Sequence, residues 1–266
     1  MRLLVTGGCG FLGGNFLRFV LQHYGPEMIT NVDSLVTGTL ANVDGVATEY
    51  GDRYEFLRAD IADSDRIDTV LTTHQYFAVV NFASASATGV VGVANLLERA
   101  RQHGVRRFVQ VSKDRVSEPG LGPVRRKGML PADEYQAEAD EIALDASREY
   151  EREIVVTRSA NNYGPMQGPR AFVSGSIIHA LRDEPVPVPG DGSTSRPWIH
   201  VDDHSAAVFT AVLEGQPGSI YHLTSDQRVR DLDVAYAILE HLGKPRDLVR
   251  LAPFEDVADP APDDDA

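Results

Sequence analysis

Three glycines near the start of the chain have the spacing of a turn that binds a dinucleotide. Gly7, Gly10 and Gly13 follow the apolar run at residues 3–5 and lead into an apolar segment with helical spacing. In such a turn the first glycine allows a sharp bend, the second lets the backbone approach a pyrophosphate, and the third lets the helix pack against the strand. The phosphate then meets the N–H groups at the start of the helix. This chemistry predicts a dinucleotide site at residues 6–13.

A carboxylate stands where the ribose of that dinucleotide is expected. Asp33 ends the strand-like run at residues 28–32, about 20 residues beyond the glycines. A carboxylate here accepts hydrogen bonds from the adenosine ribose hydroxyls of NAD and repels the extra phosphate of NADP. The predicted cofactor is therefore NAD, and Phe11 and Leu12, at the start of the helix, belong to the expected cofactor contacts.

These residues need a parallel sheet to position them, and the rest of the chain predicts one. Segments with helical spacing separate further apolar runs at residues 54–58, 78–82, 108–112 and 154–158. This alternation predicts an α/β fold with a doubly wound parallel sheet, the Rossmann arrangement. After Ser159 the elements become shorter, which predicts a small interleaved C-terminal substrate lobe ending in a loose acidic tail. The expected NAD-binding domain covers residues 1–159 and about 198–218, and the lobe covers about 160–197 and 219–266.

Two histidines and two aspartates near residue 200 resemble metal ligands. They are His200, Asp202, Asp203 and His204. We expect no metal there, because no further ligand with matching spacing follows. The pattern of residues 202–214 predicts instead a helix that is capped by an aspartate.

The charge balance limits the partners. The chain of 266 residues has 25 Lys and Arg against 39 Asp and Glu, a formal net charge of −14. This charge argues against nucleic acid or an anionic membrane surface as a partner, so local basic groups must hold any anionic substrate. A single cysteine excludes an intrachain disulfide framework. No signal peptide is visible, and no apolar run approaches the ~20 residues of a membrane helix, so we expect a cytoplasmic protein.

Eight short motifs spread over nearly the whole chain carry a family resemblance. They are TGGCGFLG, NVDSL, RADI, NFA, GVRRFVQVS, NNYGP, VPGDGSTSRPWIHVDDH and IYHLTS. With them the chain resembles the extended short-chain dehydrogenases/reductases of the NAD-dependent epimerase/dehydratase family, most of all their dTDP-glucose 4,6-dehydratase branch. The resemblance implies an enzyme that binds a nucleotide sugar, removes a hydride from carbon 4, eliminates water across carbons 5 and 6, and returns the hydride.

The resemblance also implies roles for individual residues. Besides the glycine turn and the acid after the second strand, the expected NAD contacts are Asp60, Ile61, Phe82 and Ala83. The expected substrate contacts are Ser84, His222 and, facing the diphosphate, Asn162 and Arg196. Tyr135 would take the proton of the carbon 4 hydroxyl, and Asp114 would protonate the leaving hydroxyl. A homodimer is implied through the helices around Leu96 and Ile142.

The catalytic positions depart from the family's pattern. The family's tyrosine is followed four residues later by a lysine that activates it and holds the nicotinamide ribose, whereas Ala139 follows Tyr135 here. The family's threonine, aspartate and glutamate after the fifth strand become Lys113, Asp114 and Arg115, so the base at carbon 5 is replaced. We therefore expect ordinary 4,6-dehydration to be absent or feeble.

Three interpretations are open. In the first, the Lys113 ammonium stabilises the phenolate of Tyr135 or itself acts as a base, in an NAD-dependent enzyme with altered chemistry. In the second, the protein is a non-catalytic pseudoenzyme that binds NAD or a nucleotide sugar. In the third, Lys113, Asp114 and Arg115 form a new acid/base set in a non-redox lyase or epimerase.

Overall fold

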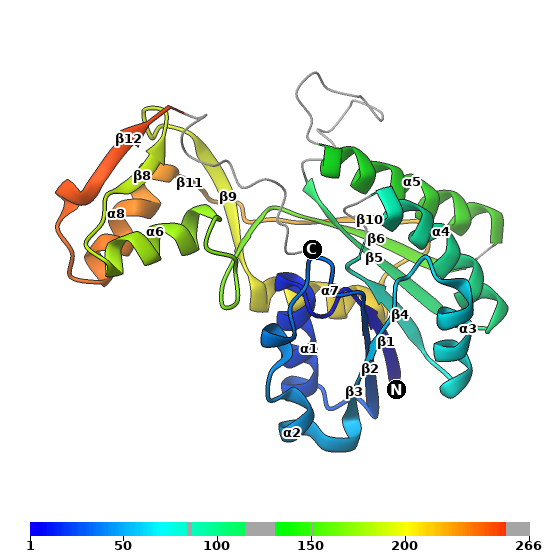
Figure 1. Cartoon of the computed structure of the whole chain (residues 1–266). Helices are drawn as coiled ribbons and strands as arrows, with labels where there is room; N and C mark the ends of the chain where they lie inside the picture. Colours follow the sequence, from blue (N-terminus) through cyan, green and yellow to red (C-terminus); the bar gives the residue numbers. More distant parts are fainter. Residues whose placement is uncertain (84–86, 115–130, 151, 254–266) are drawn as a thin grey trace.

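The computed structural model describes residues 1–83, 87–114, 131–150 and 152–253, and its centre is a parallel sheet (Figure 1). The strands of this sheet lie in the order β10-β6-β5-β4-β1-β2-β3, and all neighbours are parallel. They are β1 (Arg2–Thr6), β2 (Met28–Asp33), β3 (Tyr54–Arg58), β4 (Ala78–Asn81), β5 (Arg107–Lys113), β6 (Glu153–Ser159) and β10 (Ile220–Leu223). The predicted doubly wound parallel sheet is confirmed.

Side chains alternate along β1 and enter two apolar cores, one on each face of the sheet. Leu3 and Val5 pack with residues of α1 (Phe11–His23) and α7 (Val201–Glu214). Leu4 packs in the second core, which holds residues of α3 (Ser64–Thr73), α4 (Ala87–Gln102) and α5 (Pro131–Tyr150). Figure 1 shows these two groups of helices on opposite sides of the strands, with the short α2 (Val46–Tyr50) near the edge at β3.

The strand order reverses between β1 and β4. From β1 the chain runs outward through β2 and β3, and then continues on the other side of β1 from β4 onward. In open sheets of this kind, ligands bind outside the carboxyl ends of the strands at such a switch point. The glycine turn after β1 and the residues after β4 lie there.

The shorter elements form a second part of the molecule, on the left in Figure 1. In its core, α6 (Phe172–Leu181), β8 (Val186–Pro189) and α8 (Asp231–His241) share the buried residues Ala180, Val186, Val188, Ala235 and Leu239. β12 (Val249–Ala252) pairs with β8, and β7 (Asn161–Tyr163), β9 (Ser195–His200) and β11 (Arg228–Arg230) form a small sheet. Within the described residues the chain passes between the main and small sheets three times, at β6–β7, β9–α7 and β10–β11.

Two details differ from the sequence predictions. Residues 220–223 fall within the range expected for the substrate lobe, but as β10 they pair with β6 and extend the main sheet. α7 is capped by His200 and not by an aspartate, because the His200 Nδ1 accepts the N–H of Asp202 at 3.2 Å. Among the helices of the described ranges, none is long and apolar enough to cross a membrane.

Candidate functional site

The glycine turn joins β1 to α1 at the switch point and is too tightly packed for side chains. Gly7 has a φ of +72° and donates its N–H to the carbonyl of Val32 at 2.9 Å. A Cβ at Gly13 would lie 2.3 Å from the carbonyl oxygen of Gly7, so only glycine lets α1 approach β1 this closely. Within the described residues no side chain caps α1 at Gly10 and no acid stands in its first turn. The positive end of the helix dipole is therefore available to an anion such as the pyrophosphate of NAD.

Asp33 is buried at the end of β2, and its carboxylate is fixed beside this turn. Its Oδ2 accepts the N–H of Cys9 at 2.9 Å, and its Oδ1 accepts the N–H of Leu35 at 2.8 Å. Each carboxylate oxygen has a second lone pair, which can accept from a ribose hydroxyl. Burial, together with the Asp33 charge, raises the pKa of the Cys9 thiol to about 11, so this thiol stays protonated and unreactive at neutral pH.

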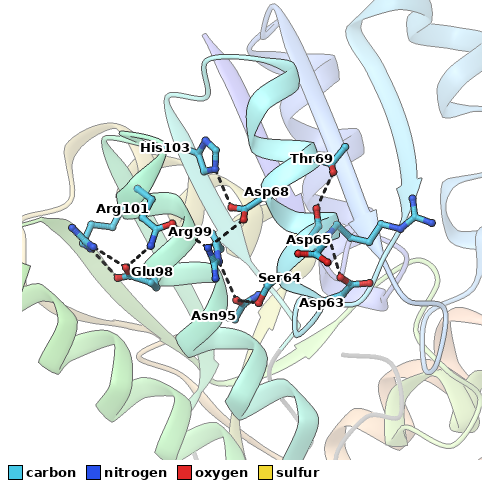
Figure 2. A network of polar contacts seen from close by, with 12 residues as sticks. Asp63, Ser64, Asp65, Asp68, Thr69, Asn95, Glu98, Arg99, Arg101 and His103 are labelled. Atoms are coloured by element: carbon cyan, nitrogen blue, oxygen red, sulfur yellow. Dashed lines mark hydrogen bonds and ion pairs between the residues drawn. The ribbon is translucent and has the colours of Figure 1, made fainter.

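The loop after β3, which carries Asp60 and Ile61, is tied to α3 and α4 by side chains. Asn95 of α4 donates its amide to the carbonyl of Ile61 at 2.8 Å. Asn95 also accepts the hydroxyl of Ser64 of α3 at 2.7 Å (Figure 2). The Ile61 side chain is buried, and the Asp60 carboxylate accepts the N–H of Ala62 at 2.9 Å. The contact with Asn95 and the turn at Asp60 therefore hold this loop, which carries two of the expected NAD contacts, in place.

The same polar network continues along the two helices (Figure 2). Asp68 of α3 pairs with Arg99 of α4 at 3.2 Å and lies 3.0 Å from His103, in the turn after α4. Arg101 and Glu98 pair within α4 at 2.7 Å. These side chains are partly exposed, so each pair contributes at most about 1 kcal/mol to stability. The two contacts of Asp68 link α3 to α4 and to the turn that follows α4.

Phe82 and Ala83 follow β4, where a buried polar network crosses the sheet. The Asn81 Oδ1 accepts the hydroxyl of Thr6 at 2.5 Å and the N–H of Ala83 at 3.1 Å. The Asn81 amide donates to the Gln110 Oε1 at 2.8 Å, and all three of these polar side chains are fully buried. This network links β1, β4 and β5 at one level and fixes the backbone that leads to the expected cofactor contacts.

Asp114 and His222 form one pair, although the sequence assigned them separate roles. Asp114 follows Lys113 at the carboxyl end of β5, and its Oδ1 lies 2.8 Å from the Nδ1 of His222 on β10. The side chains are partly open to solvent, with exposed fractions of 34% for Asp114 and 47% for His222. A ligand at the carboxyl edge of the sheet can therefore reach both groups.

Tyr135 stands near the start of α5, and its neighbour ties this helix to β5. The Gln136 side chain donates to the carbonyl of Val111 at 3.1 Å, which holds the start of α5 beside the carboxyl end of β5. Tyr135 and the Asp114–His222 pair thus lie on neighbouring elements near the carboxyl ends of the strands. Two other predicted site residues, Ser84 and Arg115, lie outside the described residues.

At the position of the family's lysine the chain faces an apolar core. Ala139 is wholly buried in the cluster between α5 and the sheet. Asp140 beside it is also fully buried, and its Oδ2 accepts from the Ser112 hydroxyl at 2.8 Å and from the Arg158 Nε at 2.9 Å. Burial raises the pKa of Asp140 from 3.8 to about 6, although Arg158 and Ser112 oppose the shift. The sequence did not indicate this ion pair.

Asn162 and Arg196, the expected diphosphate contacts, are both held in place. Asn162 donates to the Ser159 hydroxyl at 2.8 Å, and its own Oδ1 is buried without a partner among the described residues. Arg196 pairs with the buried carboxylate of Asp231 at 3.1 Å, a partner that the sequence analysis missed. Asp231 orients the guanidinium but also offsets its charge toward a diphosphate.

The two histidines near residue 200 have places in the helix cap and in the core of the fold. His200 caps α7, as described above, while His204 is wholly buried with its ring centroid 6.5 Å from that of Phe82. Burial lowers the pKa of His204 to about 4. In the part of the chain that the structure describes, no group of three or more His, Cys, Asp or Glu side chains could hold a metal ion.

Comparison with known proteins gives a consistent result. The dTDP-glucose 4,6-dehydratase of Streptomyces niveus is 34% identical over 276 residues, which cover 95% of this chain and 81% of that protein. The low-salt glycan biosynthesis protein Agl12 of Haloferax volcanii is 32% identical over 268 residues, covering 94% and 85%. The crystal structure of the Bacillus anthracis dTDP-glucose 4,6-dehydratase in complex with NAD matches with a TM-score of 0.85, at 31% identity, over 95% of this chain and 84% of that one.

A family model also matches most of the chain. It is described as the NAD dependent epimerase/dehydratase family, and it covers residues 3–223. The predicted resemblance is confirmed, and the predicted cofactor NAD is confirmed at the level of the family. The glycine turn and the carboxylate of Asp33 fit this cofactor. The chain therefore belongs to the NAD-dependent epimerase/dehydratase family.

Proposed function

We propose that this chain is an NAD-dependent enzyme that modifies a sugar nucleotide or a related sugar by epimerase/dehydratase-type chemistry, with rearranged acid/base residues. The observation that carries the proposal is the cofactor cradle at the switch point. Its turn excludes a side chain at Gly13, and the Asp33 carboxylate is fixed beside it by two backbone donors. These features suit the phosphates and the ribose of a dinucleotide.

The residues of the chain would hold the cofactor in a fixed orientation. NAD, when bound, would supply the hydride acceptor for oxidation of a sugar hydroxyl. The pyrophosphate would rest on the N–H groups at Phe11 and Leu12, at the start of α1, and the ribose on Asp33. The remaining contacts would come from Asp60, Ile61, Phe82 and Ala83.

In this proposal Tyr135 takes the proton of the sugar hydroxyl, Lys113 is its electrostatic partner and Asp114 is an acid. The support is their position on β5 and α5 at one edge of the sheet. Ala139 lies in an apolar core, so no cation acts on the tyrosine from that position. We therefore expect ordinary 4,6-dehydration to be absent or feeble.

The substrate that we propose is a nucleoside-diphosphate sugar. The oriented guanidinium of Arg196, which can donate hydrogen bonds to a diphosphate, supports this choice. Ser84 and His222 stay predicted substrate contacts. The homodimer expected through the helices around Leu96 and Ile142 also stays a prediction, which light scattering tests.

A second candidate is a non-catalytic protein that binds NAD or a nucleotide sugar. The buried Ala139 favours it, because hydride transfer in the family uses a lysine at this position. A third candidate is a non-redox lyase or epimerase that uses Lys113, Asp114 and Arg115. The contact of Asp114 with His222 favours it, because it leaves a proton-handling group at the sheet edge.

Calorimetry measures the affinity for NAD and so tests the proposed cofactor site at the glycine turn and Asp33. Wild-type protein should bind NAD, and Asp33→Asn should weaken binding at least about tenfold, because an amide replaces an acceptor that serves backbone N–H groups and the ribose. Asp65→Asn, which removes the same charge from an exposed position on α3, should leave the affinity unchanged. Absence of NAD binding by the wild-type protein would refute the proposal.

Absorbance at 340 nm, followed by mass spectrometry of the sugar, separates the candidates. With a substrate nucleotide sugar, transient NADH formation supports the redox enzyme. A changed sugar without NADH supports the non-redox candidate, and unchanged sugars throughout support the binding protein. With dTDP-glucose and NAD, loss of one water at a rate typical of the family would contradict our expectation of feeble dehydration.

A further inference from the structure

The contact of Asp114 with His222 bears on the tautomer of the neutral imidazole ring. The two groups meet through Oδ1 and Nδ1 at 2.8 Å. A carboxylate only accepts hydrogen bonds, so the proton of the neutral ring is on Nδ1 and the Nε2 has a free lone pair. This is the arrangement by which a carboxylate holds a histidine as a base in hydrolytic enzymes.

We propose that His222 is a general base of this site, oriented by Asp114, which removes a proton from the carbon next to the keto group of a keto-sugar nucleotide. The inference rests on the proposed function for its substrate class, and it assigns to His222 a catalytic role beyond substrate contact. In this step Asp114 is the ionised orienting partner of His222 and not the acid. It concerns proton transfer alone, so it can be tested apart from any redox step.

The register of the sheet places His222 on the face that is covered by α5. His222 lies opposite Arg158 of β6, and Arg158 lies opposite Ser112 of β5. Side chains at paired positions of neighbouring parallel strands point to the same face. Ser112 and Arg158 both donate to Asp140 of α5. His222 is therefore on the face that α5 covers, and Tyr135 and Gln136 lie in the second turn of this helix.

The charged groups on the neighbouring elements leave Asp114 as the orienting partner. Near the carboxyl ends of these strands they include Lys113 on β5, Asp114 directly after it, Arg158 on β6 and Asp140 on α5. The Asp140 carboxylate is wholly buried and bound to Ser112 and Arg158. Asp114 is bound to the imidazole, and both of these side chains are partly exposed. A partly exposed imidazole beside its carboxylate can meet a ligand, which the buried ion pair cannot.

The step balances without a co-reactant. The C–H bond next to the keto group breaks, and its proton goes to the Nε2 of His222. The electron pair of that bond forms the C=C bond of an enolate, whose charge rests on the former carbonyl oxygen. Asp114 keeps its hydrogen bond to Nδ1 and stabilises the imidazolium. Return of the proton restores the keto sugar, and in heavy water it delivers deuterium.

The experiment supplies dTDP-4-keto-6-deoxyglucose to the full-length protein in D₂O and follows deuterium at the carbons beside the keto group by mass spectrometry and NMR. Wild-type protein should exchange these protons faster than a protein-free sample. His222→Gln should lower the rate by about 100-fold or more, the usual contribution of a general base. Asp114→Asn should lower it by at least about tenfold, since the ring loses its orienting charge.

His241→Gln on α8, an exposed histidine in the small part of the molecule, is the matched control and should exchange like the wild type. Circular dichroism shows whether His222→Gln is folded, and His222→Asn is the second variant if it is not. Exchange by a folded variant at the wild-type rate overturns the inference, as does lack of exchange by the wild type. Exchange that depends on His222 in a protein that forms no NADH from any sugar supports the inference while refuting the redox proposal.

Discussion

Among single residues, the adjacent glycines of α1 differ in the space around them. A Cβ at Gly13 would lie 2.3 Å from the carbonyl oxygen of Gly7, whereas a Cβ at Gly14 would lie 3.3 Å from that of Asn42. We predict that Gly13→Ala weakens NAD binding at least about tenfold, because the phosphate-binding turn must move, and destabilises the fold by about 2 kcal/mol. Gly14→Ala should change NAD affinity by less than about twofold. Calorimetry and urea denaturation measure both effects, and equal affinities for the two variants would contradict the prediction.

His204 makes stability depend on pH. Its folded pKa is lowered from 6.5 to about 4, so the unfolded chain takes up a proton that the folded chain refuses, and stability falls as pH falls from about 6.5 through 4. We predict that wild-type protein loses about 2 kcal/mol more stability between pH 7.5 and 4.5 than His204→Leu does. Urea denaturation at the two pH values measures the difference. The same pH dependence in both proteins would show that His204 is accessible to protons in the fold.

The sequence allowed prediction of those site residues whose type and spacing a ligand constrains. The glycine turn and Asp33 are of this kind, because the cofactor requires a bare backbone followed by an acid at a fixed separation. Asn95, Asp140 and Asp231 could not be predicted, because each takes its role from partners on other elements. The same reason explains why Asp114 and His222 were found separately but not as a pair.

Between elements, the ion pair of Arg158 and Asp140 fastens α5 to the sheet. Removing the cation leaves the buried carboxylate of Asp140 without its charged partner, so we predict that Arg158→Met costs about 3–5 kcal/mol at pH 7.5. Asp140→Asn, which removes the buried charge and keeps the shape, should cost clearly less. Urea denaturation of the two variants tests this order, and the reverse order would contradict it.

The pH dependence of this pair has a defined sign. The Asp140 carboxyl has a pKa of about 6 in the fold against 3.8 in the unfolded chain. The folded chain therefore binds its proton more tightly, and this group's contribution to stability falls as pH rises from about 4 to 6. The loss should be larger in Arg158→Met, where no cation opposes the effect of burial, and absent in Asp140→Asn. Parallel stability curves for all three proteins over this range would contradict the assignment.

The sequence predicted the inner strands of the main sheet better than it predicted the edge strand β10. Apolar runs bounded by turns predicted β3 to β6, because burial on both faces requires such runs. The position of β10 depends on which edge it joins, and periodicity holds no information about that. The cap of α7 could not be predicted for a similar reason, because His200 accepts the N–H of Asp202 only in the ring orientation that the fold gives it.

In the whole molecule, the single tryptophan reports on the smaller part. Trp198 lies on β9, with its ring 6.2 Å from that of Phe172 and 6.5 Å from that of Tyr163. β9 runs directly into α7, which packs in the core of the main sheet. We predict that tryptophan fluorescence and far-UV circular dichroism give the same urea midpoint, because the two parts unfold together. An earlier transition by fluorescence would show that the smaller part unfolds alone.

The three passages of the chain between the main sheet and the small one also bear on how this protein can diversify. A chimera joined to a relative once, after residue 159, would place that relative's α7 and β10 against the main sheet of this chain. Exchange of the smaller part as a unit would therefore also disturb the packing of the main sheet. Replacement of single side chains at the carboxyl ends of the strands leaves this packing intact.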